Sequence, residues 1–510
     1  MSLPGDDFVL IGALLLLLGV VAAGAAERAR VPGLLVFLTV GMAIGDDGLN
    51  LLSLSDPEVA QFGAVIALVM ILFEGGLTTK PGDVRRALGP GLVLATVGVV
   101  VTAGLTTLGA WLILDVTWRT ALLIGAVVAS TDAAAVFAVL RSAPLPRRLS
   151  ALLEVESGSN DPAAIVLTLA VLATVEAPAS APDIATFAIR QLLGGVLGGV
   201  LFGVLGATVM RHLGRGPTAL YPVGALALAG VAYGTTAALG ASGFLAVYVV
   251  GLFVGALVPR HRRGIRQFHE GIANIAQIMM FLVLGLLVFP SRLPGVALPA
   301  LAVAAVLVFI ARPVAVWLCL PWFGFTPREV TLVSWAGLRG AVPIVLATFP
   351  LTAGVPGGQT IFDVVFFVVL ISSVLQSSSV GFLARWLGLP EGPDVWAPIA
   401  EAVPLDGVDA DLMEVDIVDG LAVSGQRIRD VPLPAGARLT AVLREDQVVL
   451  PDGETVLQPG DLVLVAVPRR EEATAEMVAW ARGEAVGWNP PGGAAGDQPE
   501  VEETQTDPRS

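Results

Sequence analysis

Long runs of apolar residues, separated by short polar segments, occupy the first three quarters of the chain. The hydrocarbon core of a bilayer is roughly 30 Å thick, and an α-helix crosses it with about 20 apolar residues. Residues 1–389 are therefore predicted to form an all-α polytopic membrane domain with thirteen transmembrane helices. The predicted spans are Phe8 to Ala26, Gly33 to Ile44, Val59 to Leu77, Pro90 to Leu114, Thr120 to Leu140, Leu149 to Thr174, Ile184 to Met210, Leu220 to Leu239, Gly243 to Val258, Ile272 to Phe289, Val296 to Leu320, Val330 to Phe349 and Ile361 to Leu387.

The second run, Gly33 to Ile44, is short for a span, and the placement of basic residues tests it. If all thirteen runs cross, the loops on one side hold sixteen Lys and Arg residues, whereas the loops on the other side hold only Arg119 and Arg292. This bias matches the excess of basic residues in cytoplasmic loops, and omitting the second run would destroy it. The N-terminus is therefore predicted outside and the C-terminal segment in the cytoplasm, in the plasma (inner) membrane. The first seven residues, MSLPGDD, are acidic, so no signal peptide is expected.

Composition agrees with a membrane protein and separates off an acidic C-terminal segment. Of 510 residues, 55% are hydrophobic and 14% charged, and the mean hydropathy is +0.81, far above a soluble globular composition. The net charge of −14 divides into +2 through Leu389 and −16 beyond it. No basic patch indicates nucleic-acid binding. The single Cys319 has no partner for an internal disulfide.

The segment after Leu389 has the pattern of a small α+β cytoplasmic domain. Residues 390–404 are acidic and Pro-rich, and they are predicted to be a linker. Residues 405–470 contain short alternating runs such as DLVLVAV, separated by turn signals such as PDGE and QPGD, which indicates a β-rich domain. Residues 471–510 are predicted to form a helix that ends near Arg482 and then a disordered acidic tail.

Charged residues inside the predicted spans are the first candidates for function, because an ionised group at the bilayer centre costs on the order of 2.5–3.5 kcal/mol. These residues are Glu74, Asp132, Glu154, Glu156, Asp161 and Arg339. A rise of ~1.5 Å per residue places Asp132 and Asp161 both about 18 Å deep, near the midplane. Arg190, Arg312 and Asp363 lie nearer to helix ends, and their side chains are expected to reach the membrane surface.

The stretch ESGSNDPAA in the sixth span offers two polar faces. Ser157 and Asp161 are four residues apart and share one helix face, whereas Glu156 and Asn160 share the neighbouring face. The first face can present a hydroxyl and a carboxylate to a ligand. The second face can pair Glu156 with a cation, and Arg339 is the deepest cation in the chain. An ion pair between Glu156 and Arg339 is therefore predicted, because a buried charge costs much less when it is paired.

The fifth and twelfth spans carry signals of interrupted helix. Polar residues Ser130–Asp132 lie mid-membrane in one, and the Gly-rich and Pro-containing segment 337–343 lies mid-membrane in the other. Unwound backbone at this depth is tolerated only where it is packed in protein or lines a cavity. Pro162 removes a further amide from the sixth span. Spans four to six and eleven to thirteen thus form two triplets with a broken middle helix, which predicts an inverted repeat whose broken helices cross at a midplane site.

Four motifs between residues 72 and 347 carry a resemblance to a known family: LFEGGL, STDAAAVFAVL, LEVESGSNDPAA and GLRGAVPIVLA. At these motifs the chain resembles the cation:proton antiporter superfamily, specifically its NhaP and sodium/proton-exchanger branch. The resemblance implies that Asp161 is the exchanging carboxylate and that Asn160 replaces the first Asp of the electrogenic branch. The family often has Pro after the TD of the fifth span, where this chain has Ala133, and this leaves the shape of that break open.

The same resemblance implies further roles near the exchanging carboxylate. Thr131, Ser157 and Glu74 are expected to help ligate the transported metal ion, and Glu156 is expected to pair with Arg339. Asp132 is expected near the helix crossing, either as a ligand or as a stabiliser of a helix end.

The C-terminal phrase LQPGDLVLVAV is similar to the end of potassium-channel-type regulator (RCK/TrkA-C) domains. This resemblance implies that the protein forms a homodimer and is gated by a small-molecule ligand. The helical domain is expected to contact membrane lipid. No nucleotide-binding GxGxxG half precedes the phrase, so a dinucleotide is not implied.

Together these patterns predict an antiporter. Desolvation favours the neutral form of a carboxyl group, so Asp161 is expected to hold either a proton or a monovalent cation. If only the occupied site changes sides, the two ions must exchange, and with a neutral Asn160 the exchange is one for one and electroneutral. The regulator-like domain favours export of K⁺ in exchange for H⁺, and Na⁺/H⁺ antiport is the alternative. No enzymatic activity and no cofactor beyond the transported ions is expected.

Two other classes of function fit less well. An intramembrane aspartyl protease needs two aspartates on adjacent helices and carries Gly-x-Gly-Asp, whereas this chain has Gly158-Ser-Asn-Asp161 and a buried Arg339. A gated cation channel would need a carbonyl filter such as TVGYG, which the sequence lacks. The small-residue run GGVLGGVLFGVLG in the seventh span indicates close helix packing or a dimer seam rather than a pore.

Overall fold

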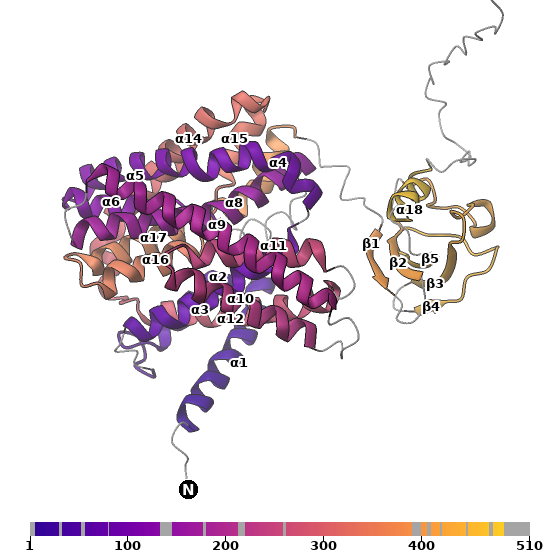
Figure 1. The fold of residues 1–510 in the computed structure, drawn as a ribbon, viewed down its shortest axis with the longest axis horizontal. Helices are drawn as coiled ribbons and strands as arrows, with labels where there is room; N and C mark the ends of the chain where they lie inside the picture. Colours follow the sequence, from indigo (N-terminus) through magenta and orange to yellow (C-terminus); the bar gives the residue numbers. More distant parts are fainter. Residues whose placement is uncertain are drawn as a thin grey trace, which may run out of the picture. The chain divides into compact units, whose positions relative to one another are not determined.

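The computed structural model divides the chain into two compact units, Met1–Pro393 and Asp394–Ser510 (Figure 1). The first unit is helical, and the second is built around a β-sheet. The residues that the structure describes are 6–29, 33–52, 57–79, 81–132, 145–176, 180–212, 220–258, 262–389, 399–404, 410–418, 421–444, 447–468 and 473–483.

The helices of the first unit follow the predicted apolar runs closely. They are α1 (Asp6–Ala29), α2 (Gly33–Ile44), α3 (Pro57–Thr78), α4 (Pro81–Val93), α5 (Val99–Ile113), α6 (Trp118–Val127), α8 (Arg147–Glu176), α9 (Ala181–His212), α10 (Leu220–Ala238), α11 (Gly243–Leu257), α12 (Arg262–Leu286), α13 (Leu293–Val306), α14 (Arg312–Cys319), α15 (Pro327–Trp335), α16 (Ala341–Thr352) and α17 (Gly358–Trp386). In the described part of the chain, 8 helices are long and apolar enough to cross a membrane, and shorter apolar helices lie at the remaining runs. The count of thirteen crossings stays a prediction.

Two spans are interrupted where the polar and Gly-rich segments predict it. In the twelfth span α15 ends at Trp335, Ala336 to Gly340 are not helical, and α16 begins at Ala341. In the fifth span α6 ends at Val127 and the chain is irregular at 130–132; its second half, including Ala133, lies outside the described residues. The breaks meet, because the Asp132 N–H donates to the Leu338 carbonyl at 2.9 Å.

Other features repeat in the way that an inverted repeat requires. A π-helical turn interrupts the fourth span at Leu94–Gly98 and the eleventh at Leu307–Ala311, and each turn packs against the helix that contains the other. Gly41 of α2 faces Gly285 of α12, and Gly76 of α3 faces Gly251 of α11; in both pairs a Cβ on one glycine would lie 3.0 Å from the other's Cα. A repeat relation that exchanges spans two and nine, and three and ten, interconverts these two crossings.

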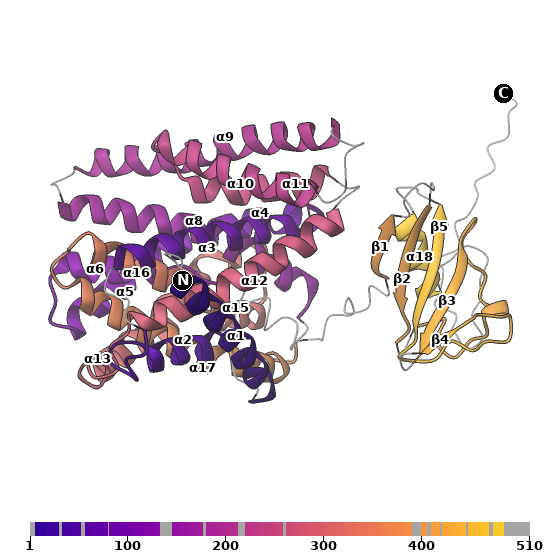
Figure 2. The same ribbon diagram turned by 90° about the horizontal axis from the view of Figure 1, so that it is seen from below.

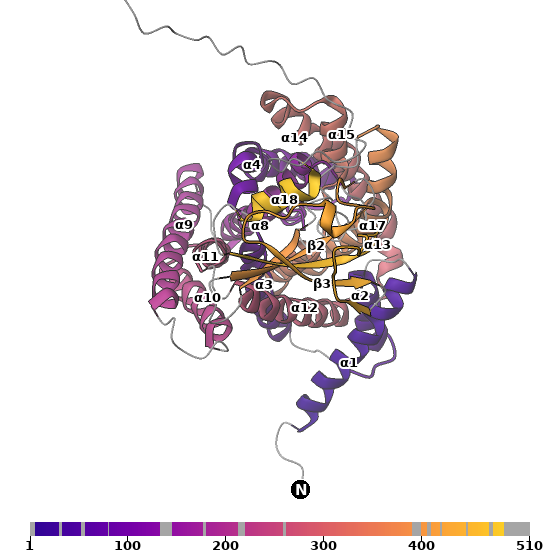
Figure 3. The ribbon, with the colours of Figure 1, turned by 90° about the vertical axis from the view of Figure 1, so that its right-hand side faces the viewer.

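The helix α8, which carries ESGSNDPAA, runs through the interior and packs against α4, α6 and α9. It stays helical through Pro162, so this proline does not add an unwound segment. The helix α9 lies at the edge of the unit beside α10 and α11 (Figures 2 and 3). The glycines of its small-residue run, such as Gly198 and Gly203, contact Thr236 of α10 and Phe253 of α11, which is the predicted close packing within the chain.

The second unit contains a 5-stranded antiparallel sheet of order β1-β2-β5-β3-β4. Its strands are β1 (Ile399–Pro404), β2 (Ala410–Asp416), β3 (Arg438–Arg444), β4 (Gln447–Val449) and β5 (Leu462–Pro468). Alternate residues of β5, such as Val463 and Val465, are buried in one core cluster with Trp480 of α18 (Ala473–Arg482). The end of the predicted linker is wrong, because Ile399–Pro404 forms a strand; residues 390–398 and the predicted disordered tail from 484 lie outside the described residues.

Candidate functional site

The carboxylate of Asp161 lies in the interior of the first unit, on α8. Its side chain is almost fully buried, with 4% of its surface exposed. The Oδ1 atom has no hydrogen-bond partner among the residues that the structure describes. Asp132 and Arg339, which belong to the two interrupted spans, are the charged groups that act most strongly on it. A buried oxygen of this kind is costly unless a proton or a cation neutralises it.

Hydroxyl and amide groups gather one turn before Asp161. The Oγ atoms of Ser157 and Thr131 lie 3.2 Å apart. Asn160 holds Thr131 at two points: its Oδ1 accepts from the Thr131 N–H at 3.2 Å, and its Nδ2 donates to the Thr131 Oγ1. All three side chains are buried. The structure thus brings together the four predicted site residues Thr131, Ser157, Asn160 and Asp161, and it shows that Asn160 fixes the backbone of the break.

The charged residues of the two breaks neutralise each other's helix ends. The Asp132 carboxylate accepts from the Ala341 N–H at 2.8 Å, at the start of α16, where the helix dipole is positive. The Arg339 guanidinium donates to the Ala129 carbonyl at 3.0 Å and to the Ser130 carbonyl, just beyond the end of α6, where the dipole is negative. A Cβ at Gly340 would overlap the Asp132 carboxylate, so only glycine fits there.

The predicted ion pair between Glu156 and Arg339 is wrong. Glu156 pairs with Arg312 instead, and the guanidinium holds both carboxylate oxygens, at 2.5 Å and 2.9 Å. The expectation that Arg312 reaches the membrane surface is also wrong, since only 3% of its surface is exposed. The physical reason is orientation: Arg312 follows the π-helical turn of the eleventh span and faces the protein interior, where Glu156 stabilises its charge.

The other candidates lie farther from this cluster or on different helices. Glu74 is half-buried near the end of α3, a helix that contacts α8, and Glu154 is half-buried on α8 itself. Asp363, which was expected at the membrane surface, is buried on α17 and accepts from Gln359 at 2.9 Å. Arg190 is exposed on α9, as expected for a side chain near a helix end.

The sequence reasoning also missed a set of polar residues on α17. Ser372, Ser373 and Gln376 are buried and form hydrogen bonds with the backbone of the break in the twelfth span. Their signal is the run SSVLQSSS, which is too polar for a lipid-facing helix segment. For Arg312 the only signal was its charge inside a predicted span, which depth alone assigned to the surface.

The charged groups of the site differ in what neutralises them. Glu156 is neutralised by Arg312, and Asp132 and Arg339 each neutralise the end of an opposing helix. Asp161 is the additional acid of this cluster, and hydroxyl oxygens lie one turn away on its own face of α8. The arrangement can therefore bind a small monovalent cation or a proton, one at a time.

Comparison with known proteins agrees with this geometry. Residues 13–386 match the transmembrane sodium/hydrogen exchanger family, and residues 412–478 match the TrkA-C domain. The K(+)/H(+) antiporter NhaP2 of Shewanella sp. (strain ANA-3) is 40% identical over 471 residues, which is 90% of this chain and 81% of that protein. The K(+)/H(+) antiporter NhaP of Alkalimonas amylolytica is 40% identical over 470 residues, 90% of this chain and 80% of that protein.

A solved structure shares the fold of the helical unit. The sodium proton antiporter MjNhaP1 from Methanocaldococcus jannaschii at pH 8 superposes with a TM-score of 0.67 and 25% identity, over 74% of this chain and 98% of that one. The buried carboxylate of Asp161, the crossing breaks and these similarities lead to one conclusion: the chain is an integral membrane antiporter that belongs to the sodium/hydrogen exchanger family and carries a C-terminal TrkA-C domain.

Proposed function

We propose that this antiporter exchanges K⁺ for H⁺, one for one, at the carboxylate of Asp161. The observation that carries the proposal is the buried Oδ1 of Asp161, which has no partner among the described residues while Glu156 on the same helix is fully paired. Relatives that are 40% identical over 90% of the chain bear the name K(+)/H(+) antiporter, which supports potassium as the cation.

The exchange follows from competition for one negative charge. A proton on Asp161 leaves no charge for a cation, and a bound cation displaces the proton. Ser157 and Thr131 supply hydroxyl oxygens that replace part of the lost hydration shell of the cation, with Glu74 as a further candidate ligand. An ionised carboxylate without a bound cation costs too much free energy inside the membrane to change sides. Only the neutralised site therefore changes sides, and this couples the two fluxes.

Electroneutral stoichiometry is supported by the contacts of Asn160. Both ends of its amide are engaged by Thr131, and an amide carries no titratable proton. One carboxylate then carries either one proton or one monovalent cation in each step. Asp132 is proposed as a helix-end stabiliser rather than a ligand, because its carboxylate accepts from the first amide of α16.

Na⁺/H⁺ exchange is the second candidate, because the superposed archaeal structure is a sodium proton antiporter. The site residues do not discriminate between the cations, since one carboxylate and two hydroxyls suit either ion. Initial rates of dye-reported exchange in everted vesicles, titrated with K⁺ and with Na⁺, separate the two candidates. A response to Na⁺ alone would overturn the preference for potassium.

The proposed setting is the plasma membrane, with the N-terminus outside and the sheet unit in the cytoplasm, as the distribution of basic residues favours.

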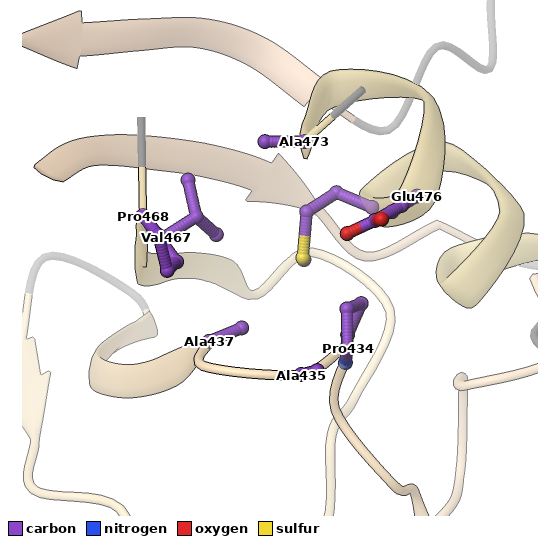
Figure 4. A pocket seen from close by; sticks show the side chains of 8 residues that line it. Pro434, Ala435, Ala437, Val467, Pro468, Ala473 and Glu476 are labelled. Atoms are coloured by element: carbon purple, nitrogen blue, oxygen red, sulfur yellow. The ribbon is translucent and has the colours of Figure 1, made fainter. Parts of the chain in front are cut away.

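We propose a homodimer whose TrkA-C domain binds a small-molecule regulator. That unit has a pocket between α18 and the end of β5, lined by Pro434, Val467, Glu476 and Met477 among others (Figure 4). Since it has room for about one water molecule, a regulator would bind elsewhere or displace Met477. Loss of regulated exchange after removal of residues 390–510 tests this role.

The site assignment is tested with Asp161→Asn and a matched control. We expect Asp161→Asn to abolish exchange in proteoliposomes and to leave the unfolding temperature unchanged or higher, because it removes an unpaired buried acid. Asp363→Asn is the control, since Asp363 is also a buried acid of the helical unit but bonds to Gln359 on its own helix. Exchange that persists in Asp161→Asn would refute the assignment.

A further inference from the structure

A cluster of polar side chains on α17 faces the interrupted part of the twelfth span. Ser372, Ser373 and Gln376 each have 1% or less of their surface exposed. Positions 372, 373 and 376 are spaced so that they share one side of a helix. Their neighbours Val374 and Leu375 are exposed on the other side. We call Ser372, Ser373 and Gln376 the α17 polar cluster.

The α17 polar cluster bonds to the backbone at two places in the twelfth span. The Arg339 N–H donates to the Ser372 Oγ at 3.3 Å, and the Ser373 Oγ donates to the Arg339 carbonyl at 2.9 Å. The Gln376 Nε2 donates to the carbonyl of Trp335, the last residue of α15, at 2.8 Å. The Ser372 hydroxyl in turn donates to the Gln376 Oε1, which joins the two places.

These contacts hold both backbone groups of Arg339, its N–H and its carbonyl. Unwound backbone inside a membrane protein must find partners for its N–H and C=O groups, and here α17 supplies them. The held backbone aims the Arg339 side chain at the Ala129 and Ser130 carbonyls beyond α6. Those carbonyls directly precede Thr131, whose N–H donates to Asn160 and whose hydroxyl lies beside that of Ser157. A small movement of the Arg339 backbone therefore shifts the Thr131 hydroxyl of the exchange site.

We propose that Ser372, Ser373 and Gln376 are positioning residues for exchange, which hold Arg339 against the carbonyls of Ala129 and Ser130 and so fix the adjoining Thr131 hydroxyl in the cation site. The proposal rests on the proposed function of Asp161 and extends it to a helix that contributes no ligand. The cluster would otherwise be a purely structural bond between α17 and the break, with no influence on ion affinity.

The direction of the effect follows from the ligand that would move. If Arg339 moves away, the Ala129 and Ser130 carbonyls lose their donor, and the Thr131 hydroxyl that follows them is no longer held beside Ser157. A misplaced ligand oxygen weakens cation binding, so the apparent KM for the cation rises while the maximal rate changes less.

The test uses the full-length protein with Ser373→Ala and Gln376→Met, which remove donors at the two places. Loss of a hydrogen bond to a buried group predicts a rise of roughly tenfold in the apparent KM for K⁺, with a smaller change in kcat. Ser373→Thr keeps the hydroxyl and is expected to restore the KM. Ser378→Ala is the control, because Ser378 is exposed on the same helix and bonds to the carbonyl of Val374 in its own turn.

A second measurement separates this proposal from the proposed function. Cation binding to the folded protein raises its unfolding temperature whether or not transport occurs, so a K⁺ titration of that temperature reports affinity alone. The polar-cluster variants are expected to need roughly tenfold more K⁺ for the same rise. If the wild type binds K⁺ without exchanging it, the proposed function fails and the cluster is still tested. Variants with unchanged K⁺ affinity would overturn the positioning role, and so would a wild type that neither binds nor exchanges a cation.

Discussion

Glu156 and Asp161 are two carboxylates on one helix, less than two turns apart, with opposite surroundings. Both are almost fully buried, with 1% and 4% of their surface exposed. Glu156 is held by the two terminal guanidinium nitrogens of Arg312, Nη1 and Nη2. Asp161 has an oxygen without a partner among the described residues, and hydroxyl groups lie nearby. Both acids are therefore buried, and they differ in the group that neutralises each charge.

This difference teaches how one helix can serve as both scaffold and binding site. A permanently paired charge costs little to keep and much to break, so Glu156 fixes α8 against the eleventh span. Under the proposed function, Asp161 takes its counter-charge from solution and exchanges what it holds, whereas the Arg312 pair keeps Glu156 from competing for the transported cation.

The strongest way to break the comparison is to remove the partner of Glu156. Arg312→Met leaves a buried, unpaired carboxylate, and we expect it to lower the free energy of unfolding by about 3–5 kcal/mol. The double variant Arg312→Met with Glu156→Gln removes both charges and is expected to recover much of that loss. Thermal unfolding of the purified protein measures both effects. Arg190→Met is the control because Arg190 is exposed.

The pairing interpretation would fail if Arg312→Met were as stable as the wild type, or if the double variant were less stable than the single one. A neutral Glu156 in the single variant would explain partial tolerance, and a loss of stability that grows with rising pH would reveal it. The sign follows because the unfolded state releases the Glu156 proton as the pH rises, whereas the buried, unpaired acid keeps it in the folded state, so the unfolded state is increasingly favoured.

A paired acid in the sheet unit sharpens the comparison outside the membrane domain. Asp461, of the PGD turn before β5, accepts from Arg444 Nε and Nη2 at 2.7 Å each and from the Gln458 N–H at 2.8 Å. Burial opposes its ionisation, but the Arg444 bonds and charge and the Gln458 N–H together lower the pKa of Asp461 below its usual value. The motif that resembles regulator domains is thus a structural turn.

Removal of this charge is expected to have an intermediate effect. Asp461→Asn should destabilise the sheet unit by about 1.5–3 kcal/mol at neutral pH, because it weakens bonds between charged groups. A lowered pKa stabilises the fold above the unfolded-state value of about 3.9, and the contribution is lost as the pH falls through the folded-state value. Hydrogen exchange of β5 amides in the full-length protein measures it. Asp416→Asn, at an exposed position in β2, is the control. Equal protection in wild type and Asp461→Asn at pH 7 would contradict this role.

The sequence predicts the helices well because hydropathy along one helix is a local property. It also predicts that Ser157 and Asp161 lie on one face of α8, since helical spacing alone puts them together. It fails for the partner of Glu156, because two arginines were available and their depth does not reveal which side of a helix each one faces. The same limit hid the α17 polar cluster, whose partners are backbone groups of another span.

The missed strand β1 has a similar cause. Ile399–Pro404 is too short to show a clear alternating pattern on its own. It forms a strand because β2 offers an unpaired edge, with Ala402 opposite Met413 and Val403 opposite Leu412. Local propensity is a weak guide where the partner strand supplies the pattern.

The smallest expected effect concerns the hydroxyl that shares a helix face with Asp161. Ser157→Ala removes an oxygen that lies 3.2 Å from the Thr131 Oγ1, without creating a buried charge. We expect the unfolding temperature to stay within error of the wild type and the apparent KM for K⁺ to rise about fivefold, as for the loss of about 1 kcal/mol of binding free energy. Ser150→Ala is the control, because Ser150 bonds to a backbone carbonyl near the start of the same helix. An unchanged KM would mean that Asp161 binds its cation without this face of α8, whereas a loss of stability instead of affinity would move Ser157 to the scaffold side of the comparison, with Glu156.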